Sequence, residues 1–444
     1  MKLKNQKKRT NFFSMASARG GSTAVPARSL QLLSGVSLVA ASLLPGMAHA
    51  AACVAVDFPG DTTVVGEVNC IDWTQSNLKV ISIGTISGEN IGLHASITNP
   101  GTTLENFGTI VGTLAGLQND AILYEVTNSN LLSSTGTGVT VAGIVNSSGA
   151  SITRVVNTTG ATLSGARAGI FNTGTIAALS NSGMISSNST FGGTIAGIWN
   201  DGGTITSLTN YGTLQSAKIG GLLQGFGVVT ENGAIETLEN TGTIVGQLGL
   251  LAQDNGRVGT LTNSGTLSGD IAGIFMDTST VGTITNTGLI VGAPSSAMGG
   301  SFDTGIYLSR ASTVSLLDNS GTITGRSAAI QIDGDSGIGT IANSGLIAGD
   351  LTSASTIPLA IAGGSGTVVG TLTGASGGLG VADKGVITVT GADLFFSGGN
   401  LLLNDDIDAT GRSVINYGTT LHINNPITIH IASSTHTCSC LPRT

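Results

Sequence analysis

The stretch LTNSGTLSGDIAGI, residues 261–274, decides the fold because the chain repeats it with few changes. Closely similar stretches are LENFGTIVGTLAGL from residue 104, LENTGTIVGQLGLL from residue 238 and LDNSGTITGRSAAI from residue 317. The shared N-x-G triplet begins at Asn106, Asn181, Asn210, Asn240, Asn263, Asn286, Asn319 and Asn343, and Asn157 opens a form one residue longer. Spacings of 29, 30, 23, 23, 33 and 24 from Asn181 onward are typical of a solenoid.

Each copy contains three short runs with β-strand propensity, separated by glycine or asparagine. In the quoted copy these runs are 258–263, 265–269 and 272–276. Leucine is too sparse for a leucine-rich repeat, and the frequent Gly, Thr and Ser disfavour helical repeats. We therefore predict an all-β chain, a right-handed parallel β-helix with about 23–30 residues per coil. The predicted core positions are Leu238, Ile244, Leu261, Leu267, Ile274, Leu317 and Ile323.

The repeated asparagine and glycine are expected at the corners of the coils. Glycine adopts left-handed conformations freely, and asparagine tolerates them and hydrogen-bonds its own backbone. Stacking would place the asparagines in a ladder with steps of ~4.8 Å. One coil buries too few aliphatic side chains to offset its backbone entropy, so the coils stabilise each other only as a stack.

Composition excludes several classes of protein. The chain has 68 glycines, 9% charged residues and a mean hydropathy of +0.34, which is too apolar for a disordered chain. The net charge is −8, and the first 50 residues hold seven Lys or Arg and no acid, so the remainder carries −8 − 7 = −15. Because phosphate binding needs a basic face, we predict no nucleic-acid partner.

Residues 1–50 have the pattern of a secretory signal peptide with an extended basic n-region. The apolar run 30–44 precedes the A-x-A triplet 48–50, and cleavage is expected between Ala50 and Ala51. The apolar run is shorter than the ~20 residues that a membrane-spanning helix needs. The chain is therefore expected to be exported.

The four cysteines fall into two pairs. Cys53 and Cys70 lie in a predicted N-terminal cap, residues 51–80, and an oxidising compartment favours a disulfide between them. Cys438 and Cys440 lie in the last seven residues. Neither pair has the spacing of a zinc site, so no metal or cofactor is predicted.

The basic signal, the cysteine pair and the tandem L-x-N-x-G-T-I-x-G coils resemble the passenger region of a bacterial autotransporter, a type V secretion protein. The resemblance covers about residues 1–430, and the segment 391–430 is similar to the end of such passengers. It implies a β-helical passenger, residues 81–430, followed by an outer-membrane β-barrel. That barrel pattern is absent here. Residues 431–444 form an unpatterned tail, interpreted as a frameshift or truncation, with a genuine short tail as the alternative.

The resemblance implies contact with the secretion machinery of the inner membrane, and display at the cell surface or release outside the cell. Without a translocator, the chain as written is expected to stay in the periplasm. The predicted function is that of a non-catalytic adhesin, or a factor for host or biofilm contact. The surface or host ligand is unknown. A non-functional fragment is one alternative.

Two short motifs resemble sites of serine hydrolases. The segment 334–337, GDSG, matches a chymotrypsin-like nucleophile motif, but His94 is the only histidine between the signal and this serine. The segment 374–378, GASGG, matches G-x-S-x-G without the strand-turn-helix unit that exposes such a serine. Both are interpreted as turns, and the chain is predicted not to be an enzyme.

A polysaccharide lyase or hydrolase on the same fold is the other alternative. Its candidate carboxylates are Asp333, Asp335, Asp405, Asp406 and Asp408, which could act as acid and base or bind calcium. The nearest basic residues in sequence are Arg326 and Arg412, and turns exposed to solvent are the favoured interpretation. The aromatic residues Trp73, Trp199, Tyr211 and Tyr417 are far apart in sequence, so no stacking strip is predicted.

Overall fold

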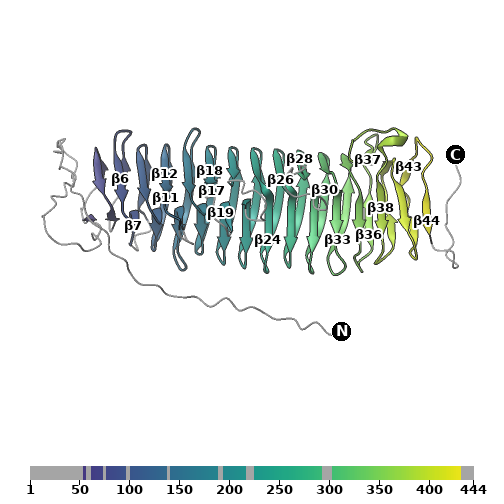
Figure 1. The fold of residues 1–444 in the computed structure, drawn as a ribbon, viewed down its shortest axis with the longest axis horizontal. Coiled ribbons are helices and arrows are strands. Elements are labelled where there is room, and N and C mark those ends of the chain that lie inside the picture. Colours follow the sequence, from purple (N-terminus) through teal and green to yellow (C-terminus); the bar gives the residue numbers. More distant parts are fainter. Residues whose placement is uncertain are drawn as a thin grey trace, which may run out of the picture.

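The computed structural model describes residues 54–56, 62–73, 77–96, 101–137, 141–188, 194–216, 225–292 and 303–431. These residues form one straight rod in which short strands stack side by side along the long axis (Figure 1). Every strand pairing between the named strands is parallel, and each strand pairs with its counterpart one coil before and one coil after. The fold is a parallel β-helix.

Each coil has three faces, here called A, B and C in chain order. Face A contains β2 Thr62–Val64, β5 Leu78–Val80, β8 Thr103–Asn106, β11 Ile122–Asn128, β14 Ser151–Asn157, β17 Thr175–Asn181, β20 Thr204–Asn210, β23 Ala234–Asn240, β25 Arg257–Asn263, β27 Thr280–Asn286, β30 Thr313–Asn319, β33 Gly337–Asn343, β36 Leu359–Ala362, β39 Leu394–Phe396 and β42 Val414–Asn416. Face B contains β3 Glu67–Asn69, β6 Thr85–Gly88, β9 Thr109–Gly112, β12 Leu131–Ser134, β15 Thr162–Gly165, β18 Met184–Ser187, β21 Thr213–Gln215, β24 Thr243–Gln253, β26 Thr266–Asp277, β28 Leu289–Gly292, β31 Thr322–Gly325, β34 Leu346–Ala348, β37 Gly370–Thr373, β40 Asn400–Leu403 and β43 Thr420–His422.

Face C contains β1 Val54–Val56, β4 Ile71–Trp73, β7 Ile91–Ala95, β10 Ala115–Asn119, β13 Ala142–Asn146, β16 Ala168–Asn172, β19 Ile195–Asp201, β22 Gly225–Glu231, β29 Thr304–Ser309, β32 Ala328–Ile332, β35 Leu351–Ser353, β38 Val386–Val389, β41 Asp406–Ala409 and β44 Ile429–Ile431. The long strands β24 and β26 run through faces B and C without a break. The one 3-10 helix among the described residues is η1, Val381–Asp383.

The core is one continuous column of aliphatic side chains. Its rows are set by strand register: Leu238, Leu261, Ile284 and Leu317 align on face A, whereas Ile244, Leu267, Ile290 and Ile323 align on face B. Ile274 lies between Leu250 and Ile306 on face C. All seven predicted core side chains are fully buried. Side chains alternate between the two sides of a strand, so the row assignments follow directly from the period-2 pattern.

Coil length varies more than the sequence repeat suggests. Successive asparagines at the end of face A lie 22 to 33 residues apart, a wider range than the predicted 23–30. Fifteen strands stack on face A. The first is β2, so residues 62–80, which were assigned to an N-terminal cap, already contain coil strands paired in register. The signal region 1–50, Ala51, Cys53 and the tail 432–444 lie outside the described residues.

The left-handed conformation expected of the corner glycine is found at the longer form, where Gly160 has φ +80°, but is wrong for the eight N-x-G triplets named above. Neither the repeated asparagines nor the glycines of these eight triplets have a positive φ. At Gly265 a Cβ atom would lie 2.1 Å from the carbonyl oxygen of Gly242, the same position one coil earlier, and Gly242 meets Gly212 at the same distance. Only glycine allows successive corners to approach so closely. Other left-handed positions include Asn255 and Gly202.

The part of the chain that the structure describes has no helix that is long and apolar enough to cross a membrane.

Candidate functional site

The repeated asparagines form a buried ladder along the rod. Each side chain is fully buried at the end of a face A strand. The Asn263 Nδ2 donates to Oδ1 of Asn286 at 2.8 Å, and also contacts the carbonyl oxygens of Gly265 and Leu289 at 3.3 and 3.1 Å. The same pattern joins Asn106, Asn128, Asn157, Asn181, Asn210, Asn240, Asn263, Asn286, Asn319 and Asn343.

A second asparagine ladder lies at the end of face C. It joins Asn119, Asn146, Asn172 and Asn200 by amide-to-amide bonds of 2.7 to 2.8 Å, and Asn200 then donates to the hydroxyl of Thr230 at 3.3 Å. Beyond Thr230 the same row continues with Ala252 and Met276. The sequence analysis missed this ladder, although Asn172 and Asn200 begin N-x-G triplets and Asn146 begins the form one residue longer, and it missed Asn128 in the first ladder, which has no such triplet. The signal that reveals both is equal spacing from the neighbouring core residues.

The ladders stabilise corners that apolar residues could not. A buried amide costs free energy unless its donors and acceptors are paired, and stacking pairs each amide with the next and with corner carbonyls. The ladders are therefore structural elements that fix the register of the coils.

Replacing Asn263 by alanine should lower the free energy of unfolding by ~2 kcal/mol, because Asn240 loses its acceptor and the carbonyls of Gly265 and Leu289 lose a donor. Asn255 is a matched control of the same residue type, exposed and at φ +66°, where Asn255→Gly should change stability by less than ~1 kcal/mol. Urea unfolding measures both. Equal urea midpoints for the two variants would show that the ladder does not stabilise the fold.

The serine of the GDSG motif belongs to a third polar row. Ser336 is fully buried, and its Oγ accepts a hydrogen bond from the Ser312 backbone N–H at 3.1 Å. The Ser312 Oγ in turn accepts from the Ser279 N–H one coil earlier. The serine of the second motif, Ser376, is held by Asp383, with 2.6 Å between the Ser376 Oγ and the Asp383 Oδ1. Both hydroxyls therefore have structural hydrogen bonds in turns.

The predicted carboxylates divide into two separate places. Asp333 follows face C strand β32 and accepts a hydrogen bond of 2.9 Å from the Tyr307 hydroxyl. Burial, together with this carboxylate, raises the pKa of Tyr307 to about 12. Asp405, Asp406 and Asp408 lie far along the rod, at the corner before β41 and within it. The two groups of carboxylates, which are far apart in the sequence, are also separated along the stack of coils.

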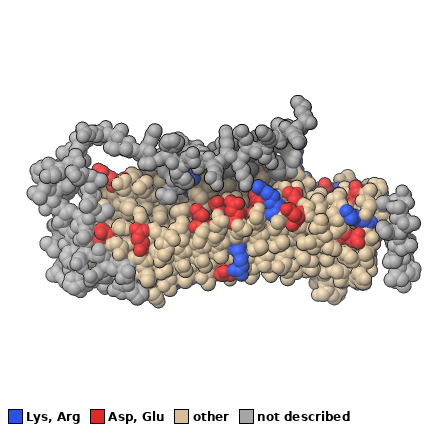
Figure 2. Space-filling model, turned by 90° about the horizontal axis from the view of Figure 1, so that it is seen from below, with Lys and Arg blue, Asp and Glu red and all other residues tan. Residues whose placement is uncertain are grey.

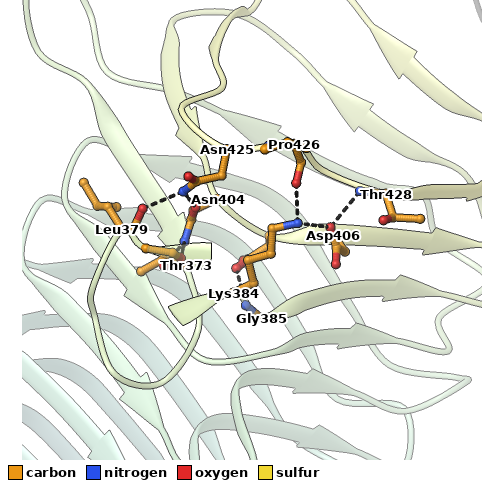
Figure 3. A network of polar contacts seen from close by, with 11 residues as sticks. Thr373, Leu379, Lys384, Gly385, Asn404, Asp406, Asn425, Pro426 and Thr428 are labelled. Atoms are coloured by element: carbon orange, nitrogen blue, oxygen red, sulfur yellow. Dashed lines mark hydrogen bonds and ion pairs between the residues drawn. The ribbon is translucent and has the colours of Figure 1, made fainter. Parts of the chain in front are cut away.

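A polar network surrounds Asp405 and Asp406 (Figure 3). Lys384, which is 22 residues away in sequence, donates to Asp406 at 2.7 Å and to the carbonyl of Pro426. The Thr428 N–H also donates to Asp406 at 2.7 Å. Arg412 is the basic residue nearest to these carboxylates along the sequence, but in the structure the coil repeat brings Lys384 to Asp406. The Arg412 Nε instead donates a hydrogen bond to the Thr390 carbonyl.

Neighbouring carboxylates in this network have opposite pKa shifts. Asp405 is 2% exposed, and burial raises its pKa to about 7 although the Gly385 N–H donates to it at 2.8 Å. At Asp406 burial acts in the same direction, but the bonds from Lys384 and Thr428 outweigh it and the pKa is lowered. The pKa of Asp408 is lowered chiefly by the Thr410 hydroxyl. The pKa of Asp405 therefore differs from those of Asp406 and Asp408 because Asp405 is buried, which the sequence does not reveal.

His94 lies between two carboxylates on face C. Its Nδ1 lies 3.1 Å from Asp72 and its Nε2 lies 2.8 Å from Asp120, one coil on either side. Burial raises the pKa of Asp120, but hydrogen bonds from Ser147 and from His94 outweigh it, so the pKa is lowered. The imidazole is thus paired at both nitrogens. Among the described residues, no group of three or more His, Cys, Asp or Glu is arranged to hold a metal ion.

Cys70 is buried and takes part in a disulfide bond. Cys53, its predicted partner, lies outside the described residues.

Two of the four aromatic residues for which no stacking strip was predicted each pair with a phenylalanine: Trp199 with Phe171 and Tyr417 with Phe395. One row on face C, outside the main core, contains Phe171, Trp199, Val229, Leu251, Phe275 and Tyr307 in consecutive coils. Ring centroids lie 5.0 Å apart, edge to face, both for the pair Phe171 and Trp199 and for the pair Phe275 and Tyr307. These residues are far apart in sequence, but insertions of variable length still bring them into one row.

An acidic row lies beside the aromatic one, two residues further along the same strands. It contains Asp201, Glu231 and Asp277, with Gln253 between the last two. Burial raises the pKa of Asp201 and of Glu231. Figure 2 shows acidic side chains gathered along the middle of one face of the rod, with few basic ones among them.

A shallow groove of about 550 Å³ crosses face B. Its lining is uncharged and is provided by Thr162, Ser164, Met184, Ser186, Ser187, Asn188, Gln215, Ser216 and Val245.

Comparison of the chain with protein-family models, with curated proteins and with solved structures finds no match.

Proposed function

We propose that the chain is the exported passenger of an autotransporter-like protein, whose rod presents its outer faces for contact with a surface or host ligand and performs no catalysis. The observation that carries this proposal is the continuous parallel stack of fifteen strands on face A. Outward positions on face A repeat as rows, such as Thr237, Thr260 and Thr283, and Glu239, Thr262 and Thr285. A stiff array that presents similar polar groups in several successive coils is suited to many weak contacts at once.

The resemblance in sequence supports the secretion route, and the rod supports the display role. Acidic groups dominate the charged part of the visible face (Figure 2), which favours a ligand that is neutral or basic over an anionic one. The partly exposed members of the aromatic row, Trp199, Phe275 and Tyr307, add apolar area beside these carboxylates. Both features belong to the regular stack, so a contact surface made from them needs the rod to be folded.

The proposal predicts a gain of adhesion when the chain is displayed. Gram-negative cells that express it fused to the translocating barrel of another autotransporter should bind abiotic surfaces or host cells several-fold better than cells with the barrel alone. Surface labelling establishes display. A Leu267→Asp variant, displayed to the same level but with disrupted coils, should lose the gain. Unchanged adhesion by cells with verified display of the wild-type rod contradicts the contact role.

A polysaccharide-acting enzyme has one observation in its favour. Asp405 with a raised pKa lies next to Asp406 with a lowered pKa, which is how acid and base pairs are often divided. Burial of Asp405 argues against contact with a substrate. Incubation of the refolded chain with a panel of polysaccharides separates the two functions, since cleavage that is lost in Asp406→Asn would favour the enzyme.

A further inference from the structure

Residues 374–385, here called the C-terminal strap, lie between face B strand β37 and face C strand β38. In the preceding coil only Gly349 and Asp350 connect the same two faces. The strap rises above the rod near its C-terminal end and contains η1 (Figure 1). It is folded on itself, because the Gly374 N–H donates to the Asp383 carbonyl at 2.8 Å and the Asp383 carboxylate accepts from Ser376 and from the Gly380 N–H.

The strap is tied to the two coils that follow it. Asn404 donates to the Gly380 carbonyl at 3.2 Å, and Asn425 donates to the Leu379 carbonyl at 2.6 Å (Figure 3). The Lys384 ammonium bridges Asp406 and the Pro426 carbonyl. A single connection therefore holds three successive coils together, and the last of these is the coil of β44.

Two carboxylates meet where the strap rejoins the rod. The Asp350 Oδ1 accepts from the Val386 N–H at 3.0 Å, and the Asp405 Oδ1 accepts from the Gly385 N–H at 2.8 Å. A Cβ atom on Gly385 would lie 3.0 Å from the Asp405 oxygen and 3.2 Å from the Asp350 oxygen. The two carboxylate groups therefore come close to each other beside one glycine. When both are charged they repel each other, and the nearby cation, Lys384, is engaged by Asp406.

We propose that the C-terminal strap, together with Asp350 and Asp405, is a pH-dependent latch that holds the last coils of the rod closed at acidic pH and loosens them above neutral pH. Protonation of Asp405 removes the repulsion and leaves its Oδ1 free to accept the Gly385 bond. Besides Asp350 and Asp405, the charged groups that face this junction are Lys384 and Asp406. His430 and Asp408 lie on the neighbouring strands β44 and β41.

The direction follows from proton linkage. The pKa of Asp405 is about 7 in the folded rod, above the ordinary value of 3.8. At a pH between these two values, Asp405 is therefore protonated in the folded state and deprotonated in the unfolded state. The stability that depends on Asp405 is therefore complete at acidic pH, falls as the pH rises toward 7 and is fully lost above it. Between pH 5 and pH 8 this linkage changes the local opening constant roughly 100-fold.

Hydrogen exchange of the full chain, followed by mass spectrometry and corrected for the intrinsic effect of pH, tests the latch. Protection in residues 370–431 should fall roughly 100-fold from pH 5 to pH 8 relative to residues 225–292 of the same molecule. In Asp405→Asn the amide oxygen can still accept the Gly385 bond, so protection should become nearly independent of pH. His430→Gln, which removes the imidazole paired in register with Asp408, should leave most of the fall.

The same experiment can overturn the proposal. An equal pH response of the two segments in the wild-type chain contradicts the latch whatever the variants do. A fall that persists in Asp405→Asn and disappears in His430→Gln assigns the response to the histidine and also contradicts it. Asp350→Asn provides a second test. Burial is the larger cause of the raised Asp405 pKa and repulsion by Asp350 the smaller, so the variant should reduce the wild-type fall without abolishing it, and an unchanged fall would contradict the role of Asp350 in the latch.

Discussion

Replacing Leu267 by aspartate should unfold the coils on both sides of it. Leu267 is fully buried on face B, aligned between Ile244 and Ile290. The substitution loses the burial of an aliphatic side chain, about 1.5–3 kcal/mol, and places an unpaired carboxyl group in an apolar column. Together we expect a loss of ~5 kcal/mol or more. Coil-resolved hydrogen exchange should show the loss of protection centred on β24, β26 and β28.

The neighbouring residue provides the control. Ser268 lies on the same strand but is partly exposed, because successive side chains alternate between the two sides of a strand. Ser268→Asp should therefore change stability by less than ~1 kcal/mol. If Leu267→Asp were equally mild, the assignment of rows to the interior would be wrong.

Replacing Gly265 by alanine should have the second largest effect. The new Cβ would lie 2.1 Å from the Gly242 carbonyl oxygen and 2.6 Å from the Thr241 carbonyl carbon, and both are backbone atoms that cannot turn away. The corner must open, which strains the bonds from the Thr266 N–H to the Gly242 carbonyl and from the Leu289 N–H to the Gly265 carbonyl, each 2.9 Å long. We expect a loss of ~3 kcal/mol or more in urea unfolding.

Gly202 separates the two reasons for having glycine. It has φ +69° and no atoms within 4 Å of an added Cβ, so Gly202→Ala should cost only the ~1 kcal/mol of a left-handed backbone. Gly265 has the close contact without the unusual φ. A larger loss for Gly202→Ala than for Gly265→Ala would show that backbone conformation, and not close approach, governs these corners.

The asparagine ladders show which structural residues the sequence repeat alone can predict. The N-x-G triplet located nine of the ten rungs of the first ladder, counting the longer form at Asn157, because the corner chemistry is local to each copy. Asn128 was missed because Asn130 occupies the place of the glycine. The second ladder was missed although Asn172 and Asn200 begin N-x-G triplets, because the triplet alone does not tell which ladder an asparagine joins. Only alignment across coils assigns these asparagines to a separate row.

The C-terminal network was only half predictable. The carboxylates Asp405, Asp406 and Asp408 stand out in the sequence as one acidic group. Their different protonation depends on whether each is buried or solvated, and on Lys384 and Asp350, which lie 22 and 56 residues from Asp406. The His94 cluster is similar, since Asp72 and Asp120 reach the imidazole only because each coil returns to the same place.

The sequence by itself determined the β-helix, its core rows and the position of its corners. These depend on short-range patterns, alternation of aliphatic residues and a repeated turn, that every coil contains within two dozen residues or so. Only the tertiary structure decided which surface residues become neighbours, because insertions change the number of residues per coil but not the register of the strands. The aromatic row, the second ladder and the paired carboxylates at Gly385 all follow from that register, in which contact across coils replaces closeness along the chain.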